Sequence, residues 1–254
     1  MQSSLVALLR TGLNLWFTLL LLTAAVADAG SLSVVGKSRW VEVGSIIDGD
    51  TFRSRSGEKI RLLGINTPEI AHDNQPSQPF GPQAKRQLSQ LISGKTVRLQ
   101  LDRERKDRFG RTLAQIYLRD GSWINELLVK DGLAYTYTFA PNFRWTKALL
   151  KAETEARRAM RGIWKSEAFR VVDAVDVNRR QIGEFRLIRG YIQRVEKWRF
   201  QLGKVTVTVP RSARKWFENY QIPQHGQRVI VRGQLRTNAN GTLFLALHSP
   251  YDLE

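Results

Sequence analysis

The sequence is most tightly constrained by a series of short strand-like segments that end in tight turns. Between residues 41 and 63, runs of β-branched, aromatic and aliphatic residues are separated by Asp48-Gly49-Asp50 and Ser56-Gly57. Such turns between short runs are typical of antiparallel hairpins. The same composition recurs in two later segments. We therefore predict five strands, at residues 41–47, 51–55, 58–63, 96–101 and 111–118.

Three helices are predicted between and after these strands. Pro82 opens the first helix and Gly94 ends it. Ser122 caps the second, which Gly132 ends. The third begins near Arg144 and carries its apolar residues on one stripe. The residues of that stripe are Leu149, Ala152, Ala156, Met160 and Ile163. Five short strands with interleaved helices favour a small barrel of the oligonucleotide-binding (OB) type.

A second strand-rich region begins near residue 184. Its alternating apolar and polar residues predict five strands, with one helix at 214–219 between the third and the fourth. The strands are 185–195, 200–202, 205–209, 229–235 and 243–247. This pattern suits a second Greek-key barrel. The predicted fold class is therefore α+β, with an OB-fold domain at 40–168, a polar linker at 170–183 and a smaller OB-like β-barrel domain at 184–254.

The N-terminal segment has the pattern of a secretory signal. Arg10 precedes an apolar run over residues 13–27, and small residues suited to signal peptidase follow. Residues 1–29 are thus predicted to be a signal peptide, although residues 11–29 are long enough to act as an uncleaved membrane anchor. Both interpretations place the rest of the chain outside the cytoplasm, in the periplasm or the extracellular space. Residues 31–39 are predicted to be a short linker.

Charge and cysteine content narrow the partners and the kinds of metal site. The chain has 40 Lys and Arg against 23 Asp and Glu, so its net charge is +17. A surface this basic concentrates polyanions such as nucleic acid or anionic membrane. The sequence contains no cysteine, which excludes disulfides and thiolate metal sites. Any metal ion would therefore be held by oxygen or imidazole ligands.

Three short segments together supply the groups that phosphodiester hydrolysis requires. They are residues 47–51 (IDGDT), 61–69 (RLLGINTPE) and 107–111 (DRFGR). Taken singly, each is more simply an ordinary turn or strand end. Together they offer carboxylate and amide oxygens for a hard divalent ion, a second carboxylate to orient water, and two arginines to neutralise a pentacoordinate phosphate. Arginine suits that role because its planar fork grips two phosphate oxygens at once.

These segments, in this order, resemble the staphylococcal nuclease (thermonuclease) family over residues 41–165. They are joined by the Phe80-Gly81-Pro82 helix start, the helix at residues 125–129 and Gly132-Leu133-Ala134. The resemblance implies a five-stranded OB barrel with three helices. It also implies a calcium-dependent endonuclease that hydrolyses DNA or RNA and leaves 3′-phosphate products.

The resemblance assigns the site residue by residue. It implies that Asp50 and Asn66 bind calcium with the backbone carbonyl of Thr67, and that the catalytic residues are Arg61, Glu69 and Arg111. It assigns substrate binding to Arg108, Phe109, Tyr137 and Phe139. The family prototype has aspartate where this chain has Asn66, so calcium binding is expected to be weaker or the metal to be different.

Other conspicuous residues are expected to be structural. His72, His225 and His248 are too scattered for a zinc site. Core packing is the simpler role for the tryptophans at 123, 145 and 164. Two interpretations stay open for the basic residues of the second domain, which could form a nucleic-acid track or be exposed by strand alternation alone. These include Arg186, Arg189, Arg194, Lys197, Arg199, Arg211, Arg214, Lys215, Arg228, Arg232 and Arg236.

Two function classes remain open. The first is an exported, metal-dependent nuclease of low sequence specificity. The second is a nucleic-acid-binding protein whose altered metal site no longer supports catalysis. A membrane-surface scaffold ranks last because it leaves Arg61, Glu69 and Arg111 unexplained. DNA or RNA preference and endonucleolytic or exonucleolytic cutting are left open by the sequence.

Overall fold

The computed structural model describes residues 37–71 and 76–254. The predicted signal or anchor at residues 1–29 and the loop residue His72 lie outside this range. The first strand begins at Ser38, so the predicted linker at 31–39 extends too far by two residues. Within the described residues, no helix has the length and apolar character needed to cross a membrane.

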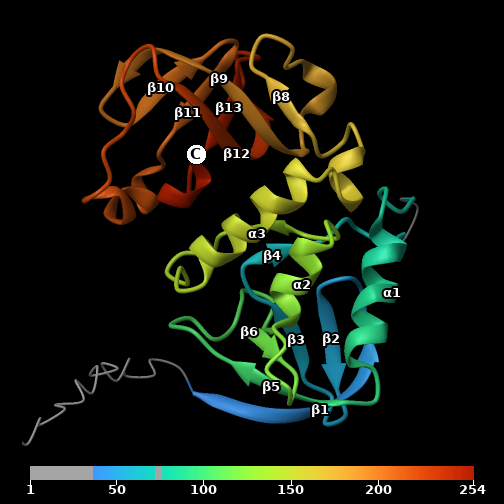
Figure 1. The fold of residues 1–254 in the computed structure, drawn as a ribbon. Helices are drawn as coiled ribbons and strands as arrows, with labels where there is room; N and C mark the ends of the chain where they lie inside the picture. Colours follow the sequence, from blue (N-terminus) through green and yellow to red (C-terminus); the bar gives the residue numbers. More distant parts are fainter. Residues whose placement is uncertain (1–36, 72–75) are drawn as a thin grey trace, which may run out of the picture. The chain divides into compact units, whose positions relative to one another are not determined.

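Five strands close into a barrel in the order β1-β2-β3-β6-β5, as the turn pattern predicts (Figure 1). A bulge bends β1, and this bend lets the five short strands close into a barrel. The bulge between Val43 and Ser45 interrupts its pairing with β2, and a Cβ at Gly44 would lie 2.9 Å from the carbonyl oxygen of Ser54. Bulges sharpen twist and let strands turn barrel corners. The strands are β1 (Ser38–Ile46), β2 (Thr51–Ser54), β3 (Lys59–Leu62), β5 (Thr96–Gln100) and β6 (Thr112–Tyr117).

The helices of this barrel are α1 (Gly81–Ile92), α2 (Ile124–Lys130) and α3 (Thr146–Arg158). The predicted Ser122 cap is wrong. Trp123 occupies the N-cap position and makes no side-chain cap bond, while the backbone of Ser122 closes the preceding turn on Asp120. The predicted stripe of the third helix also extends too far. The helix ends at Arg158, and Met160, at φ 50°, is 52% exposed.

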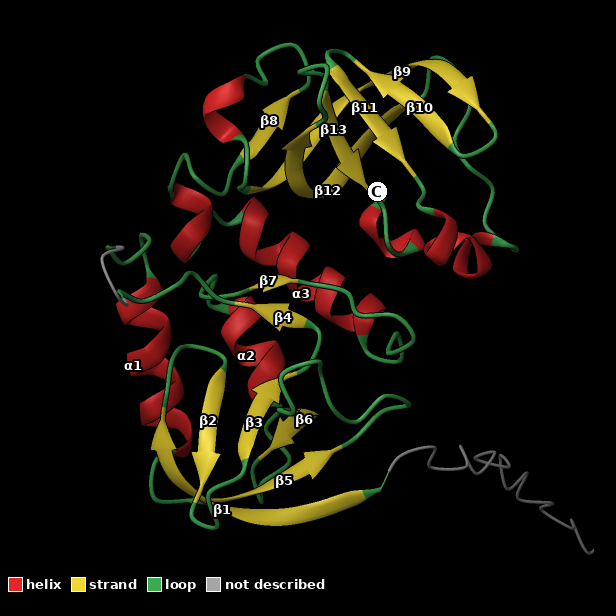
Figure 2. Ribbon diagram, turned by 180° about the vertical axis from the view of Figure 1, so that it is seen from behind, coloured by secondary structure: helices red, strands yellow, loops and turns green. Residues whose placement is uncertain are grey.

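Two strands too short to predict complete the first half of the chain. Residues Ile65–Asn66 form β4 and Tyr135–Thr136 form β7, and the two pair antiparallel so that Asn66 faces Tyr135. Strand β7 also lies against α3 (Figure 2). This small sheet holds a predicted metal ligand next to a buried tyrosine.

The second barrel is confirmed, and one strand that was not predicted is added to it. Its strands follow the order β10-β11-β13-β12-β9, and a β10–β9 pairing closes the ring. Residues Val171–Asp173, predicted to be linker, form β8, which pairs in parallel with β9. The predicted helix at 214–219 is a 3-10 helix at Arg211–Phe217 instead.

The barrel strands are β9 (Phe185–Glu196), β10 (Arg199–Leu202), β11 (Val205–Thr208), β12 (Arg228–Thr237) and β13 (Leu243–Ala246). Short 3-10 helices at Gly162–Lys165, Arg179–Gln181 and Pro250–Asp252 complete the described elements.

A buried ion pair connects α3 to the second barrel. Arg232 on β12 donates to both carboxylate oxygens of Glu153, at 3.0 and 2.9 Å, and also contacts Glu254. The side chains of Arg232 and Glu153 are 1% and 0% exposed. Burial alone would raise the pKa of Glu153, but the charge and hydrogen bonds of Arg232 outweigh it and hold that pKa below its usual value. Arg232 is thus part of the interior, and Arg186 of the same barrel is also buried, at 7% exposed.

Candidate active site

Asp50 is a buried carboxylate in the tight turn between β1 and β2, where it is 5% exposed. Its Oδ2 atom accepts hydrogen bonds from the backbone nitrogen of Thr67, at 2.8 Å, and from the Thr67 hydroxyl, at 3.1 Å. The guanidinium of Arg61, on β3, lies 3.0 Å from the same oxygen. The turn thus brings together residues 11 to 17 positions apart in the sequence, as the motif predicts.

Asn66 lies on the other side of Arg61. Its Oδ1 atom accepts from Arg61 Nη2 at 2.6 Å, and its Nδ2 atom donates to the Tyr135 hydroxyl at 2.7 Å. The same Nδ2 also donates to the carbonyl oxygen of Thr67, at 3.3 Å. Burial raises the pKa of Tyr135, so this phenol stays a neutral partner for the amide. The amide is therefore held with its oxygen toward Arg61 and Asp50.

The donor set fits a hard divalent cation. Arg61 contacts both a carboxylate oxygen of Asp50 and the amide oxygen of Asn66, and the carbonyl oxygen of Thr67 accepts from the amide nitrogen of Asn66. Oxygen ligands of these three kinds are the ones that calcium prefers. The cation found between Asp50 and Asn66 is the guanidinium of Arg61. A metal ion bound to these oxygens would therefore compete with Arg61 for them.

Asp48 is a second carboxylate in this turn that the motif reading did not single out. Its Oδ1 atom accepts from the backbone nitrogen of Asp50 at 2.9 Å. Burial and the negative charge of Asp50 together raise the pKa of Asp48 to about 6. Within the described parts of the chain, no three His, Asp or Glu side chains form a group that could hold a metal ion.

Glu69 is exposed, and its backbone is fixed by the start of α1. The carbonyl oxygen of Glu69 accepts from the backbone nitrogen of Gln78 at 2.9 Å, and its backbone nitrogen donates to the Gln78 side chain at 3.0 Å. A Cβ at Gly81 would collide with the Glu69 carbonyl oxygen. Phe80, at φ 70°, turns the chain into the helix at this point. The residues at the start of α1 therefore hold the backbone of Glu69 in place.

Arg111 is oriented by Asp107 across a tight turn. Its Nε atom lies 2.7 Å from Asp107 Oδ2, while Oδ1 accepts from the backbone nitrogens of Arg111 and Phe109. Partial burial opposes ionisation of Asp107, but these hydrogen bonds outweigh it and lower its pKa. This hydrogen bond uses Nε and so leaves the two terminal nitrogens of the guanidinium as donors. Those nitrogens are the fork that grips phosphate oxygens.

These residues line one cavity of about 650 Å³, which we call the site pocket. It contains every predicted metal-binding and catalytic residue and two of the four predicted to bind substrate. From the predicted set, its lining includes Asp50, Arg61, Asn66, Thr67, Glu69, Arg111, Tyr137 and Phe139.

Arg108 and Phe109 lie outside the lining of the site pocket. Phe109 is 68% exposed, and the guanidinium groups of Arg108 and Arg111 lie 4.7 and 5.5 Å from its ring centroid. An exposed ring flanked by two cations is a surface suited to a nucleotide. These residues therefore extend the site rather than enclose it.

The second barrel also contributes to the site pocket, which the sequence did not indicate. Phe185 on β9 stacks on Tyr135, with ring centroids 4.3 Å apart, and lines the cavity together with Glu184 and Gln234. None of these residues stands out by type or spacing in the sequence. Their position depends on how the second barrel packs against the first.

Comparisons with known proteins agree with the geometry. A family model described as "Staphylococcal nuclease homologue" matches residues 59–166. The chain is 37% identical to a thermonuclease of Staphylococcus intermedius over 138 residues, which cover 53% of this chain and 80% of that protein. It is 34% identical to a thermonuclease of Staphylococcus hyicus over 124 residues, covering 48% and 73%. It is also 34% identical to the endonuclease YncB of Bacillus subtilis (strain 168) over 128 residues, covering 48% and 60%. The match of the family model ends before the second barrel begins.

Proposed function

Because this chain belongs to the staphylococcal nuclease family, we propose that it is an exported, metal-dependent endonuclease that hydrolyses the phosphodiester backbone of DNA or RNA. One observation carries the proposal. The site pocket gathers Arg61, Glu69 and Arg111 beside a set of oxygen ligands. These are the groups needed to orient water and to neutralise the charge that grows on phosphorus.

Glu69 is the carboxylate that orients and deprotonates the attacking water. It is exposed and can therefore reach a substrate phosphate in the site pocket. Arg111 grips phosphate oxygens with the two terminal nitrogens that Asp107 leaves available. Arg61 joins it once its contacts with Asp50 and Asn66 open. Water attacks in line, the 5′ oxygen leaves, and the product carries a 3′-phosphate.

Asp50, Asn66 and the Thr67 carbonyl would hold the cation, which we propose to be calcium. A bound divalent ion supplies Lewis-acid stabilisation of the phosphate charge. With an amide at position 66, the site has one anionic ligand among the three assigned, so we expect calcium affinity to be modest.

Substrate binding is assigned to the aromatic and basic residues around the pocket. Tyr137 and Phe139 line it with their rings in edge contact, 5.0 Å between centroids. Phe109 and Arg108 form the exposed extension. Aromatic faces bind bases with little sequence preference, in keeping with a nuclease of low specificity.

We propose two domains, at residues 40–168 and 184–254, after an N-terminal signal or anchor at residues 1–29. The apolar run at residues 13–27 supports export, to the periplasm or the extracellular space. The rival proposal is a nucleic-acid-binding protein without catalysis. The exchange of a charged ligand for Asn66 favours it, because catalysis depends on an occupied metal site.

The test is degradation of single-stranded DNA and of RNA by the full-length protein with calcium, with other divalent ions and with a chelator. Glu69→Gln and Arg61→Ala serve as variants, and Lys197→Ala, exposed on the second barrel, is the control. We expect cutting that the chelator and both site variants abolish and that the control retains. Binding without cutting in every ion would refute catalysis and support the rival.

A further inference from the structure

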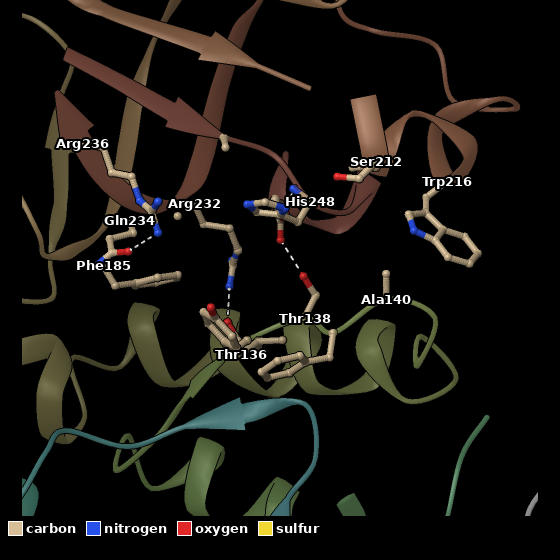
Figure 3. Close-up of a pocket in the computed structure, with 16 residues that line it drawn as sticks. Thr136, Thr138, Ala140, Phe185, Ser212, Trp216, Arg232, Gln234, Arg236 and His248 are labelled. Carbon is tan, nitrogen blue, oxygen red and sulfur yellow. Dashed lines mark hydrogen bonds between the residues drawn. The ribbon is translucent and has the colours of Figure 1, made fainter. Parts of the chain in front are cut away.

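A second cavity lies beside the site pocket, bounded by both barrels. This inter-barrel pocket has a volume of about 350 Å³. Thr138 lines it from the first barrel, and Arg236, Trp216 and His248 line it from the second (Figure 3). Phe139 of the first barrel also lines it. Its volume lies within the range of small-ligand sites.

The two cavities are contiguous. Tyr137, Phe139, Phe185 and Gln234 line both of them, so these four side chains form the shared wall. Tyr137 contacts Phe139 edge-on and lies 6.0 Å from Phe185 between ring centroids. The wall between the catalytic residues and the inter-barrel pocket therefore contains three aromatic rings.

Arg236 is the cation of this pocket that faces solvent. It is exposed, and its Nη2 atom donates to Gln234 Oε1 at 2.8 Å. Arg232, which also lines the pocket, is committed to Glu153 and Glu254. Several other arginines predicted for a basic track are likewise held in ion pairs, which weakens the interpretation of a general track. These are Arg186, Arg189 and Arg199.

Charged side chains from both barrels act on the Tyr137 hydroxyl group. Burial and the charge of Asp252 raise the pKa of Tyr137, and the charges of Arg61, Arg236 and Arg108 act against that increase. Charged side chains of both barrels therefore act on the Tyr137 hydroxyl, and the charge of Asp252 has the largest effect among them.

The acidic residue of the inter-barrel pocket has its carboxylate oxygens occupied by hydrogen bonds within the protein. Asp252 has its carboxylate engaged by the Thr138 hydroxyl at 2.7 Å and by the backbone nitrogens of His248 and Ser249 at 2.8 and 2.9 Å. These three neutral donors stabilise the carboxylate and hold it away from a free contact with solvent cations. The pocket therefore offers a phosphate the guanidinium of Arg236 and offers a base the rings of Phe139 and Trp216.

We propose that the inter-barrel pocket is a nucleotide subsite for an unpaired strand that extends from the scissile phosphate, with Arg236 on a backbone phosphate. The inference rests on the proposed nuclease function and names its substrate class as single-stranded nucleic acid. A base must leave its duplex to enter a cavity of this size and stack on its aromatic walls. The second barrel thereby selects the substrate that the first barrel cuts.

Binding is the test, measured by fluorescence anisotropy in the full-length Glu69→Gln variant so that the probe is not consumed. The probe is a labelled single strand of about ten nucleotides, compared with the same strand in a duplex. Arg236→Ala removes the phosphate contact, and Ser212→Glu places a negative charge in the inter-barrel pocket, which Ser212 lines. Arg194→Ala is the matched control because Arg194 is exposed on β9 and lines neither pocket.

We expect Arg236→Ala to weaken single-strand binding about tenfold, the usual effect of losing a charged hydrogen bond. Its dependence on salt should become shallower, by about 0.7 in log–log slope. Ser212→Glu should weaken binding as well, and Arg194→Ala should leave it unchanged. Equal losses in Arg236→Ala and Arg194→Ala, or equal affinity for strand and duplex, would overturn the subsite. Selective loss in Arg236→Ala together with an inactive wild type would refute the nuclease and support the subsite.

Discussion

Replacing Arg232 with alanine should destabilise the protein strongly, because it leaves the carboxylate of Glu153 buried without its main partner. Arg232 and Glu153 are 1% and 0% exposed and share two hydrogen bonds. Removing one member of such a pair costs about 3–5 kcal/mol. The Thr136 backbone nitrogen, which donates to Glu153 at 2.6 Å, and Arg157 would compensate only part of this loss.

Urea denaturation followed by circular dichroism measures this cost. The double variant Arg232→Met with Glu153→Leu removes both charges and should lie within about 1–2 kcal/mol of wild type, since apolar replacements of buried pairs are often neutral or stabilising. A loss below about 1 kcal/mol for Arg232→Ala, or an equal loss in the double variant, would refute the reasoning, because surface pairs contribute no more than that.

The same pair gives the stability of the protein a pH dependence. The pKa of Glu153 is lowered in the folded state, so its contribution is present above the unfolded value near 4.5 and is lost as pH falls toward the folded pKa. Acid unfolding of wild type should therefore begin below about pH 4.5. In the double variant this contribution should be absent. An identical acid profile in both proteins would contradict the assignment.

Three further outcomes follow from the geometry. Arg61→Ala should abolish cutting yet raise calcium affinity by about tenfold, because a cation that competes for the metal ligands is removed. Terbium luminescence measures this affinity, and an unchanged or weaker affinity would contradict the competition. Asn66→Asp should tighten calcium binding in the same assay through its added charge, and no change would remove Asn66 from the ligand set. Gly132→Ala should lower the free energy of unfolding in urea by more than about 2 kcal/mol, since its φ is 67° and a Cβ would collide with the Arg161 carbonyl. The control Gly121→Ala, at φ 88° with open space around it, should lower it by only about 1 kcal/mol. Equal losses in the two variants would show that the collision is not the cause.

The strands and the core were predictable because their signals are local. Phe52, Ile60 and Leu62 alternate with polar residues between turn signals, and all three are fully buried. Element ends were less predictable. Met160 continues the apolar stripe in sequence, but its positive φ ends the helix geometry and exposes its side chain.

Features set by tertiary contact left no readable pattern. Strands β4 and β7 have two residues each, too few to show alternation, yet they align Asn66 with Tyr135. Strand β8 forms within a polar segment because β9 supplies a partner. Asp48 looked like a turn residue, and Phe185 and Gln234 looked like ordinary strand residues. Their place in the site depends on the packing of the two barrels.

Hydrolysis of phosphodiester bonds in the pocket of Arg61, Glu69 and Arg111 is measured by the single-turnover cleavage rate of one labelled oligonucleotide at saturating calcium, for wild type and for Glu69→Gln. We expect wild type to cleave it to 3′-phosphate ends. We expect the variant to lose about a hundredfold or more of that rate, the usual contribution of a positioned general base. Equal rates in the two proteins, or no cleavage by wild type, would contradict hydrolysis in this pocket.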